Sequence, residues 1–234
     1  MKNNNNIKIS RSKIELFIEC PRCFWLEFRH GIKRPEGFAG GFIGQKYDPI
    51  IKNEFDEYRK NSNKPEKLEK LDLELFDDFE KLKFWRNKGV EFYHQEHNFV
   101  YYGKIDELLI DKSGNLVPFD FKTTLSKNFQ IYESYKRQLE IYGYLFLKNG
   151  HLVANYGAFY VVKIDIVKDF QNLNKSESII MEEKDIVIVE NLDYSKYDEI
   201  LEKLKEVYYK EKPPEPNSNC SFCNYWQSIK QLEL

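Results

Sequence analysis

The chain has 234 residues, enough for one sizeable domain with small additions. Its formal net charge of −2 excludes the overall basic excess of many nucleic-acid-binding proteins, while 41% hydrophobic residues supply ample material for a core. Positive charge gathers only at the start, where the first 34 residues hold eight Lys or Arg against three Glu. This basic segment fits either an arm that lies along a phosphate backbone or a solvated helix surface.

The sequence lacks the marks of a membrane or secreted protein. No stretch reaches the roughly 18 apolar residues of a membrane span, and the polar, Asn-rich start is not a signal peptide. We therefore expect a cytoplasmic protein without membrane contact, whose four cysteines stay reduced. We also expect a disordered leader over residues 1–9 and one domain over 10–234.

The first half of that domain is expected to be mainly helical. Ser12 and Glu15 fit a capping box at the start of a short helix. The segment Gly31–Gly44 is rich in glycine and predicts a loop. Apolar residues at helical spacing predict a helix over 45–60, and a helical or mixed segment over 66–84.

The centre of the chain changes to a strand pattern. Val, Tyr, Ile and Leu enrich Phe99–Ile110, and Leu116–Lys122 forms a second apolar run. The polar segment Asp111–Asn115 between them is a strong turn signal, so the two runs predict a hairpin. Further helices are expected over 130–148 and 195–210, and further strands over 156–166 and 185–190. The mixture predicts an α/β fold.

Three polar residues of this hairpin are expected to converge. Asp106 and Asp120 are equally distant from the middle of the turn, so symmetric pairing places them opposite each other. Lys122 follows Asp120 by two residues and shares its face. Two carboxylates suit Mg²⁺ or Mn²⁺, and a lysine can offset charge that develops on a phosphate. A solvated, ion-paired outer face of the hairpin explains the same three residues.

The next predicted helix offers two further site residues. Gln138 and Tyr142 are four residues apart and share a helical face. A helix beside the hairpin can aim the Gln amide and the Tyr hydroxyl at the carboxylates or at a DNA strand. Taken alone, Gln138 is better explained as a surface polar residue and Tyr142 as a core aromatic.

In order along the chain, these segments resemble a known family. Gly103–Asp106, Phe119–Thr124 and Gln138–Tyr142 are similar to the second, third and Q-x-x-x-Y motifs of PD-(D/E)xK nucleases. Ser10–Leu26 resembles the start of the RecB-like branch, which includes CRISPR-adaptation exonucleases. The resemblance implies a restriction-endonuclease-like mixed sheet flanked by helices.

The same resemblance implies an activity. It is metal-dependent cleavage of single- or double-stranded DNA, in repair, recombination or CRISPR adaptation. A helicase or a CRISPR-associated protein is the partner that the resemblance suggests. The alternative is a nuclease-fold DNA-binding module, or a subunit of a larger complex, with weak or no turnover.

One motif of the family departs from its usual form. RecB-like members usually carry a His on an early helix in a G-x-x-x-H pattern, whereas Gln45 stands at that place here. Asp48, Glu54 and Glu96 are candidates to replace this metal ligand. We expect Glu96 to do so, because it immediately precedes the predicted strand that carries Asp106.

The cysteines form two C-x-x-C pairs at metal-ligand spacing. Cys20 with Cys23 and Cys220 with Cys223 account for all four cysteines of the chain. Four thiolates suit Zn²⁺ or an iron–sulfur cluster, and such a centre would join segments 10–30 and 213–228 as a clasp. The resemblance favours a [4Fe–4S] cluster, although its members usually place one cysteine at the start and three at the end. The two-plus-two arrangement suits zinc, and two unrelated buried pairs remain the alternative.

Overall fold

The computed structural model describes residues 6–35, 40–126, 128–168 and 178–232. Residues 1–5 of the predicted leader lie outside this part. Ile7–Ser10 form strand β1, which pairs in parallel with β4 (Phe99–Gly103), and Ile9 is fully buried. The prediction of a disordered leader is therefore wrong from Ile7 onward, because Ile9 contributes to the core.

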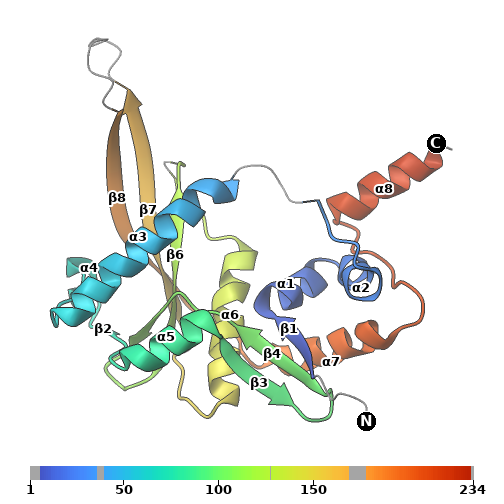
Figure 1. Cartoon of the computed structure of the whole chain (residues 1–234), viewed down its shortest axis with the longest axis horizontal. Helices are drawn as coiled ribbons and strands as arrows, with labels where there is room; N and C mark the ends of the chain where they lie inside the picture. The colour runs from blue at the N-terminus through green and yellow to red at the C-terminus, as the bar shows by residue number, and fades with distance from the viewer. Residues whose placement is uncertain (1–5, 36–39, 127, 169–177, 233–234) are drawn as a thin grey trace.

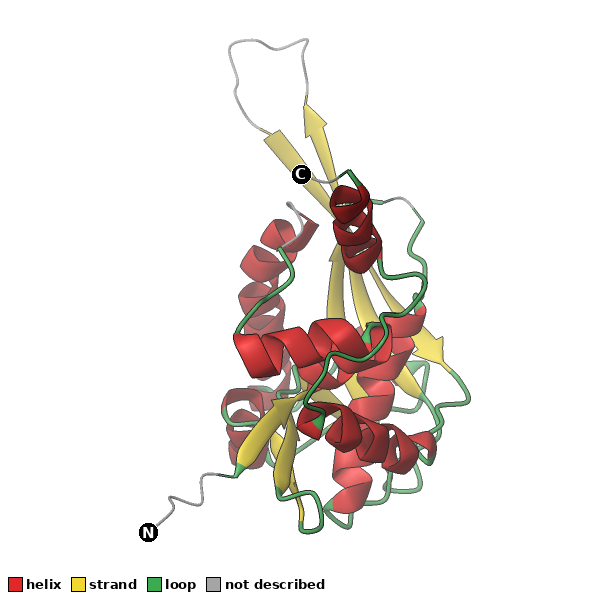
Figure 2. Ribbon diagram, turned by 90° about the vertical axis from the view of Figure 1, so that its right-hand side faces the viewer, coloured by secondary structure: helices red, strands yellow, loops and turns green. Residues whose placement is uncertain are grey.

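A five-stranded mixed sheet forms the centre of the fold (Figure 1). Its strands lie in the order β2 (Glu74–Leu75), β5 (Glu107–Ile110), β6 (Leu116–Thr124), β7 (Gly157–Lys168) and β8 (Ser178–Val189). Strand β6 pairs in parallel with β7, and the other neighbours are antiparallel. The outer ends of β7 and β8 project beyond the other elements (Figures 1 and 2). This is the α/β fold with a mixed sheet that the sequence predicted.

A smaller sheet lies beside it, in the order β1, β4 and β3 (Val90–His94). The predicted strand Phe99–Ile110 is therefore two strands, β4 and β5, which belong to different sheets. The chain leaves the smaller sheet after Gly103 and enters the central sheet at Glu107. Asp106 lies at this crossing, directly before β5.

Helices α3 (Gly40–Lys60) and α6 (Glu133–Lys148) cover opposite faces of β6. Alternate residues of a strand point to opposite faces. Phe119 and Phe121 contact Phe55 of α3 in one apolar cluster. Asp120 and Lys122 consequently face α6. The strand therefore delivers its apolar residues to one helix and its charged residues to the other.

The remaining helices differ in part from the expected ones. The segment 66–84 contains α4 (Glu66–Glu69), β2 and the start of α5 (Phe79–Asn87). Helix α1 (Arg11–Glu19) has Ser10 as its N-cap residue, so the predicted capping box of Ser12 and Glu15 is not formed. Glu15 instead accepts hydrogen bonds from Arg137 of α6, which fixes α1 against that helix.

The two ends of the chain pack together through α2 (Pro21–His30) and α7 (Lys196–Tyr209). The indole Nε1 of Trp25 donates to the carbonyl of Lys210 over 2.9 Å. Helix α8 (Ser221–Gln231) follows and stands at the edge of the molecule (Figure 2). Cys223 is its buried residue, so its attachment depends on the cysteines.

The basic residues of the N-terminal segment are largely engaged within the protein. Lys13 pairs with Glu27, and Arg34 pairs with Glu19 at 2.5 Å. These pairs favour the ion-paired surface over a free phosphate-binding arm. Among the described residues, no helix is long and apolar enough to cross a bilayer.

Candidate active site and cysteine cluster

The central hairpin has the symmetric register that the sequence predicted. Glu107 pairs with Phe119 and Ile110 with Leu116, and the same register one step further sets Asp106 opposite Asp120. Asp120 is 1% exposed. Burial, the largest cause, and the charge of Asp106 raise the pKa of the Asp120 carboxyl against the lowering effect of Lys122, and the result is about 7. A buried carboxyl beside a second carboxyl group is suited to a divalent cation.

Gln138 joins three of the predicted site residues through its side-chain amide. Its Nε2 donates to Asp120 Oδ1 over 2.8 Å, and its Oε1 accepts from the Lys122 ammonium over 2.9 Å. Lys122 Nζ also donates to Asp120 Oδ2 over 2.5 Å. The Tyr142 hydroxyl lies 3.3 Å from Gln138 Nε2. The structure thus gathers Asp120, Lys122, Gln138 and Tyr142 around one point, as the sequence predicted.

Tyr142 reaches this point because a glycine makes room for its ring. A Cβ atom at Gly103 would lie 2.9 Å from the Tyr142 ring, closer than side chains pack. Gly103 begins the segment that crosses from the smaller sheet to Asp106. The motif glycine therefore lets α6 approach the crossing chain closely enough to share its site.

Aromatic rings surround the ammonium of Lys122 on its remaining side. Its Nζ lies 4.8 Å from the centroid of the Tyr135 ring and 5.2 Å from that of Phe159. Ring faces attract a cation and restrict its positions. Lys122 is thereby held beside Asp120 rather than extended into solvent.

Helix α3 brings two further charged residues to the carboxylates. Lys52 Nζ pairs with Asp106 Oδ1 at 2.6 Å. Asp48, one helical turn earlier, is partly buried, and its pKa is raised by that burial and then by the charge of Asp106. Lys52 and Lys122 oppose this shift. Asp48 therefore lies within electrostatic reach of both Asp106 and Lys122.

Glu96, the expected replacement for the family's histidine, is not part of this cluster. It is exposed in the turn between β3 and β4, at the far end of β4 from Gly103. Proximity to the strand in sequence was misleading, because β4 runs its whole length between Glu96 and Asp106. Glu54 is likewise engaged elsewhere, pairing with Lys184 at 2.7 Å. The side chain of Gln45 lies outside the described residues, and Asp48 is the candidate that the fold brings to the site.

A buried ionic network holds the backbone of Asp106 in place. Glu107, fully buried, pairs with Arg59 of α3 and, at 3.0 Å, with Arg86 of α5. Arg86 Nε donates to the Asp106 carbonyl over 2.7 Å, and its Nη1 pairs with Asp56 at 2.8 Å. This network was not predicted from the sequence, because its members come from three separate elements. The three-residue spacing of Asp56 and Arg59 along α3 is the one local signal that could have pointed to part of it.

The four cysteines form the second cluster. Cys20 and Cys23, before and within α2, meet Cys220 and Cys223, before and within α8. All four are buried, and their sulfur atoms lie within 4.8 Å of one another. Burial is the largest cause that raises the pKa of Cys23 and Cys223, and a metal cation would favour the thiolate form of these two residues. The donor set fits a metal centre.

Comparisons with known proteins identify the family of the chain. A family model described as the PD-(D/E)XK nuclease superfamily matches residues 8–228. A solved structure of a protein named SSO0001 is similar at 17% identity with a TM-score of 0.42, over 95% of this chain and 85% of that one. No curated protein matches the chain significantly. Since the family model spans nearly the whole chain and its motif residues converge in space, the chain belongs to the PD-(D/E)XK nuclease superfamily.

Proposed function

We propose that the chain is a divalent-metal-dependent nuclease that hydrolyses phosphodiester bonds of DNA. The observation that carries this proposal is the convergence of Asp106, Asp120 and Lys122, held together by Gln138. Asp106 and Asp120 would hold Mg²⁺ or Mn²⁺, with Asp48 as a third carboxylate in place of the family's histidine. Hard oxygen ligands of this kind suit either ion.

The bound cation would act as a Lewis acid toward the phosphate and make a water molecule more acidic. The side chains of the protein then have separate tasks. Lys122 places a fixed positive charge where negative charge develops on the phosphate oxygens. Gln138 holds the Lys122 ammonium and the Asp120 carboxylate in one orientation. Tyr142 adds a hydroxyl at the same point.

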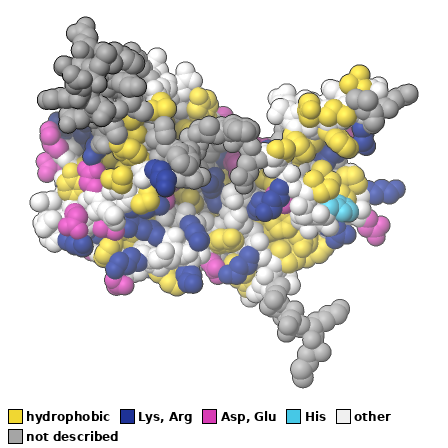
Figure 3. Space-filling model, turned by 45° about the horizontal axis from the view of Figure 1, so that its top comes forward, with side chains coloured by type: hydrophobic (Ala, Val, Ile, Leu, Met, Phe, Trp, Pro, Cys, Tyr) yellow, Lys and Arg dark blue, Asp and Glu magenta, His cyan; other side chains and the backbone are white. Residues whose placement is uncertain are grey.

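Positive charge around the carboxylates supports a polyanionic substrate. Lys52 and Lys122 flank Asp106 and Asp120, and Arg11 acts on Tyr142 from α1. Lysine and arginine side chains also lie across the middle of the face shown in Figure 3. Local charge of this kind draws a phosphate backbone to a protein whose net charge is slightly negative.

Cleavage of labelled single- and double-stranded DNA with Mg²⁺, Mn²⁺ or chelator tests the proposal. The wild type is expected to cut with either metal and to stop with chelator. Asp120→Asn should lower the rate roughly 10³-fold, because it removes a charged ligand worth several kcal/mol. Asp185→Asn, on exposed β8, is the matched control and should cut normally. Equal rates for Asp120→Asn and wild type would contradict the proposal.

We further propose that the cysteine cluster holds one zinc ion rather than the [4Fe–4S] cluster that the family resemblance favours. Zn–S bonds of about 2.3 Å in a tetrahedron set sulfur atoms about 3.8 Å apart. Cys20 and Cys223 are 3.8 Å apart, and Cys23 is 3.6 Å from both Cys220 and Cys223. In a [4Fe–4S] cluster each thiolate binds a different iron, which separates the sulfurs by roughly 6 Å.

Metal analysis of protein purified without oxygen tests the zinc proposal. Colourless protein with about one zinc per chain is expected. Brown protein with iron and visible absorption would show the cluster instead. Four thiolates would leave a zinc ion no coordination position for water, so a zinc centre here would have a structural role.

A DNA-processing pathway follows only from the resemblance to the RecB-like branch. We include repair, recombination and CRISPR adaptation in the proposal, with a helicase or CRISPR-associated protein as partner. A neighbouring gene for either partner would support it, and co-purification of the two proteins tests it.

A further inference from the structure

A cavity of about 330 Å³ opens beside the candidate active site, between the end of β6 and the start of α6. Its lining includes Thr123, Asn128, Phe129, Tyr132 and Tyr135. The volume lies at the lower end of the range for small-ligand sites, about 300–1,000 Å³. The cavity is therefore large enough for one flat ring system but not for a larger cofactor.

Aromatic rings form much of the cavity wall. The Phe129 and Tyr135 rings are nearly parallel, at an interplanar angle of 13°, and the Tyr132 ring stands at 80° to that of Tyr135. Tyr132 is 57% exposed, so much of its ring is open to a ligand. Exposed ring faces of this kind stack on nucleic-acid bases, because every base offers a π-face.

Exposed amide side chains add polar groups to the cavity wall. Asn128 and Gln130 are both exposed and line the cavity. Their amides can donate and accept hydrogen bonds, as can the edges of a base.

The cavity and the catalytic residues share a wall. Thr123 directly follows Lys122, and the Tyr135 ring that lines the cavity lies 4.8 Å from the Lys122 ammonium. Tyr135 also precedes Gln138 by one turn of α6. A phosphate bound beside Lys122 would therefore adjoin the cavity.

We propose that this cavity binds the base of the nucleotide that adjoins the scissile phosphate. The inference rests on the proposed nuclease function and extends it, because it gives the enzyme a contact with a base in addition to the backbone. Stacking against Tyr132 supplies affinity for any base, and the exposed amides of Asn128 and Gln130 can meet the base edge.

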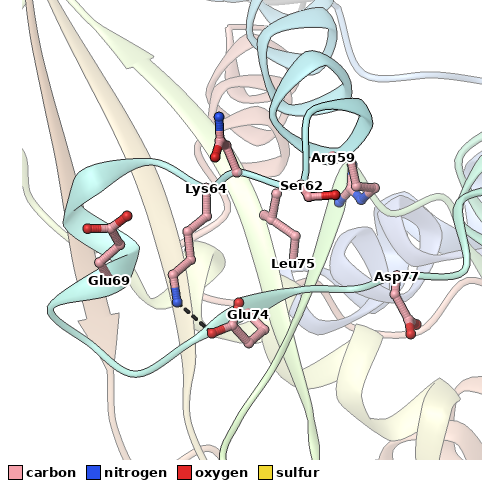
Figure 4. A pocket seen from close by; sticks show the side chains of 8 residues that line it. Arg59, Ser62, Lys64, Glu69, Glu74, Leu75 and Asp77 are labelled. Carbon is pink, nitrogen blue, oxygen red and sulfur yellow. Dashed lines mark hydrogen bonds and ion pairs between the residues drawn. The ribbon is translucent and has the colours of Figure 1, made fainter.

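A second hollow of the described residues, of about 380 Å³, does not share these properties. It lies at the far end of α3, around Lys64, Glu69 and Glu74 (Figure 4). Lys64 already pairs with Glu74 at 2.5 Å, and its lining lacks an aromatic ring. Acidic side chains would repel a nucleotide there.

Binding of small ligands tests the cavity independently of cleavage. Ligand-observed NMR would compare deoxythymidine 5′-monophosphate with deoxyribose 5-phosphate, which has the same sugar and phosphate but no base. The wild type is expected to bind the nucleotide more tightly. Tyr132→Ala should weaken nucleotide binding about tenfold and abolish this preference. Phe84→Ala removes an equally exposed ring on α5, at 58% exposure, and should keep it.

Tyr132→Phe provides a second variant that keeps the ring without the hydroxyl. It should retain the preference for the nucleotide, because stacking needs only the ring face. Equal binding of both ligands by the wild type, or a preference that survives Tyr132→Ala, would overturn the proposal. A preference that disappears in Tyr132→Ala and persists in Tyr132→Phe supports the cavity even if the wild type cuts no DNA, a result that would contradict the nuclease function alone.

Discussion

The guanidinium of Arg86 holds the backbone of Asp106 in place, with its Nε 2.7 Å from the Asp106 carbonyl oxygen. The same guanidinium pairs with buried Glu107 and with Asp56 of α3. The crossing segment that carries Asp106, the helix that carries Asp48 and the central sheet therefore meet at one side chain. Arg86 contacts none of the side chains that we propose as metal ligands. Its role is therefore to position Asp106 through the backbone carbonyl of that residue.

Replacement of Arg86 by alanine should be strongly destabilising. It leaves the Glu107 carboxylate with Arg59 alone, and breaking a buried ion pair costs about 3–5 kcal/mol. Urea unfolding measures the loss. Lys83→Ala, which removes an exposed ion pair from the same helix, is the control and should cost less than about 1 kcal/mol. Similar losses for the two variants would show that the network is not held by Arg86.

The raised pKa of Asp120 predicts how the metal-free protein responds to pH. Its folded pKa of about 7 lies above its ordinary value of 3.8, chiefly because the carboxyl is buried. The folded state thus holds the proton more tightly, and its stabilising contribution is complete below pH 3.8 and lost as pH rises through about 7. In chelator, wild type should lose stability between these values relative to Asp120→Asn. Parallel pH profiles of the unfolding midpoint would refute this.

The chemistry of the hairpin was predictable because it is local. A single turn fixes the register of Asp106 against Asp120, and the period of a strand then fixes the side of Lys122. The regular period of a helix likewise places Gln138 and Tyr142 on one face. Their role beside the hairpin was expected from the motif resemblance, because it depends on how α6 packs against β6.

The predictions that were wrong concern residues whose positions depend on packing between distant segments. Glu96 is near Asp106 in sequence but lies at the other end of β4, whereas Asp48 is far in sequence and is carried in by α3. Strand β1 has too few residues for a pattern and forms only because β4 offers an edge. The branch within the superfamily remains a prediction from motif resemblance.

Asp48→Asn should impair metal-dependent cleavage, because Asp48 acts on Asp106 and Lys122 from α3. Removing one carboxylate from the ligand set should raise the Mg²⁺ concentration needed for half-maximal rate by about 10- to 100-fold. Glu96→Gln is the matched control and should leave the metal titration unchanged. The reverse pattern would restore Glu96 as the third ligand.

Gln138→Ala should reduce turnover without unfolding the chain. Its amide fixes both Lys122 and Asp120, and loss of such a supporting partner costs about 10- to 100-fold in activity. The loss should fall on kcat rather than KM, since Gln138 is 8% exposed and has little surface for DNA. Gln227→Ala on exposed α8 controls for the loss of an amide. An unchanged kcat would reduce Gln138 to a packing residue.

Loss of the cysteine-bound metal should release α8 before it unfolds the rest of the chain. Cys223 is the buried residue of α8, whereas Tyr225 and Trp226 are 67% and 53% exposed. The start of the chain has a different attachment, because Trp25 of α2 is packed against α7 and bonded to Lys210. Apolar packing therefore retains α2 when the metal is absent. Among the described residues of α8, Cys223 is the buried one, so this helix has no similar apolar attachment.

Cys223→Ser and metal chelation should consequently give the same result. Limited proteolysis should cut the segment 211–219 faster, and hydrogen exchange should rise in α8 while β6 and α6 stay protected, because weakly packed elements open first. Ser218→Ala, in the same segment but outside the cluster, should leave both readouts at the wild-type level. Protein that contains no metal, and whose proteolysis is indifferent to Cys223→Ser, would show the cysteines to be two unrelated pairs.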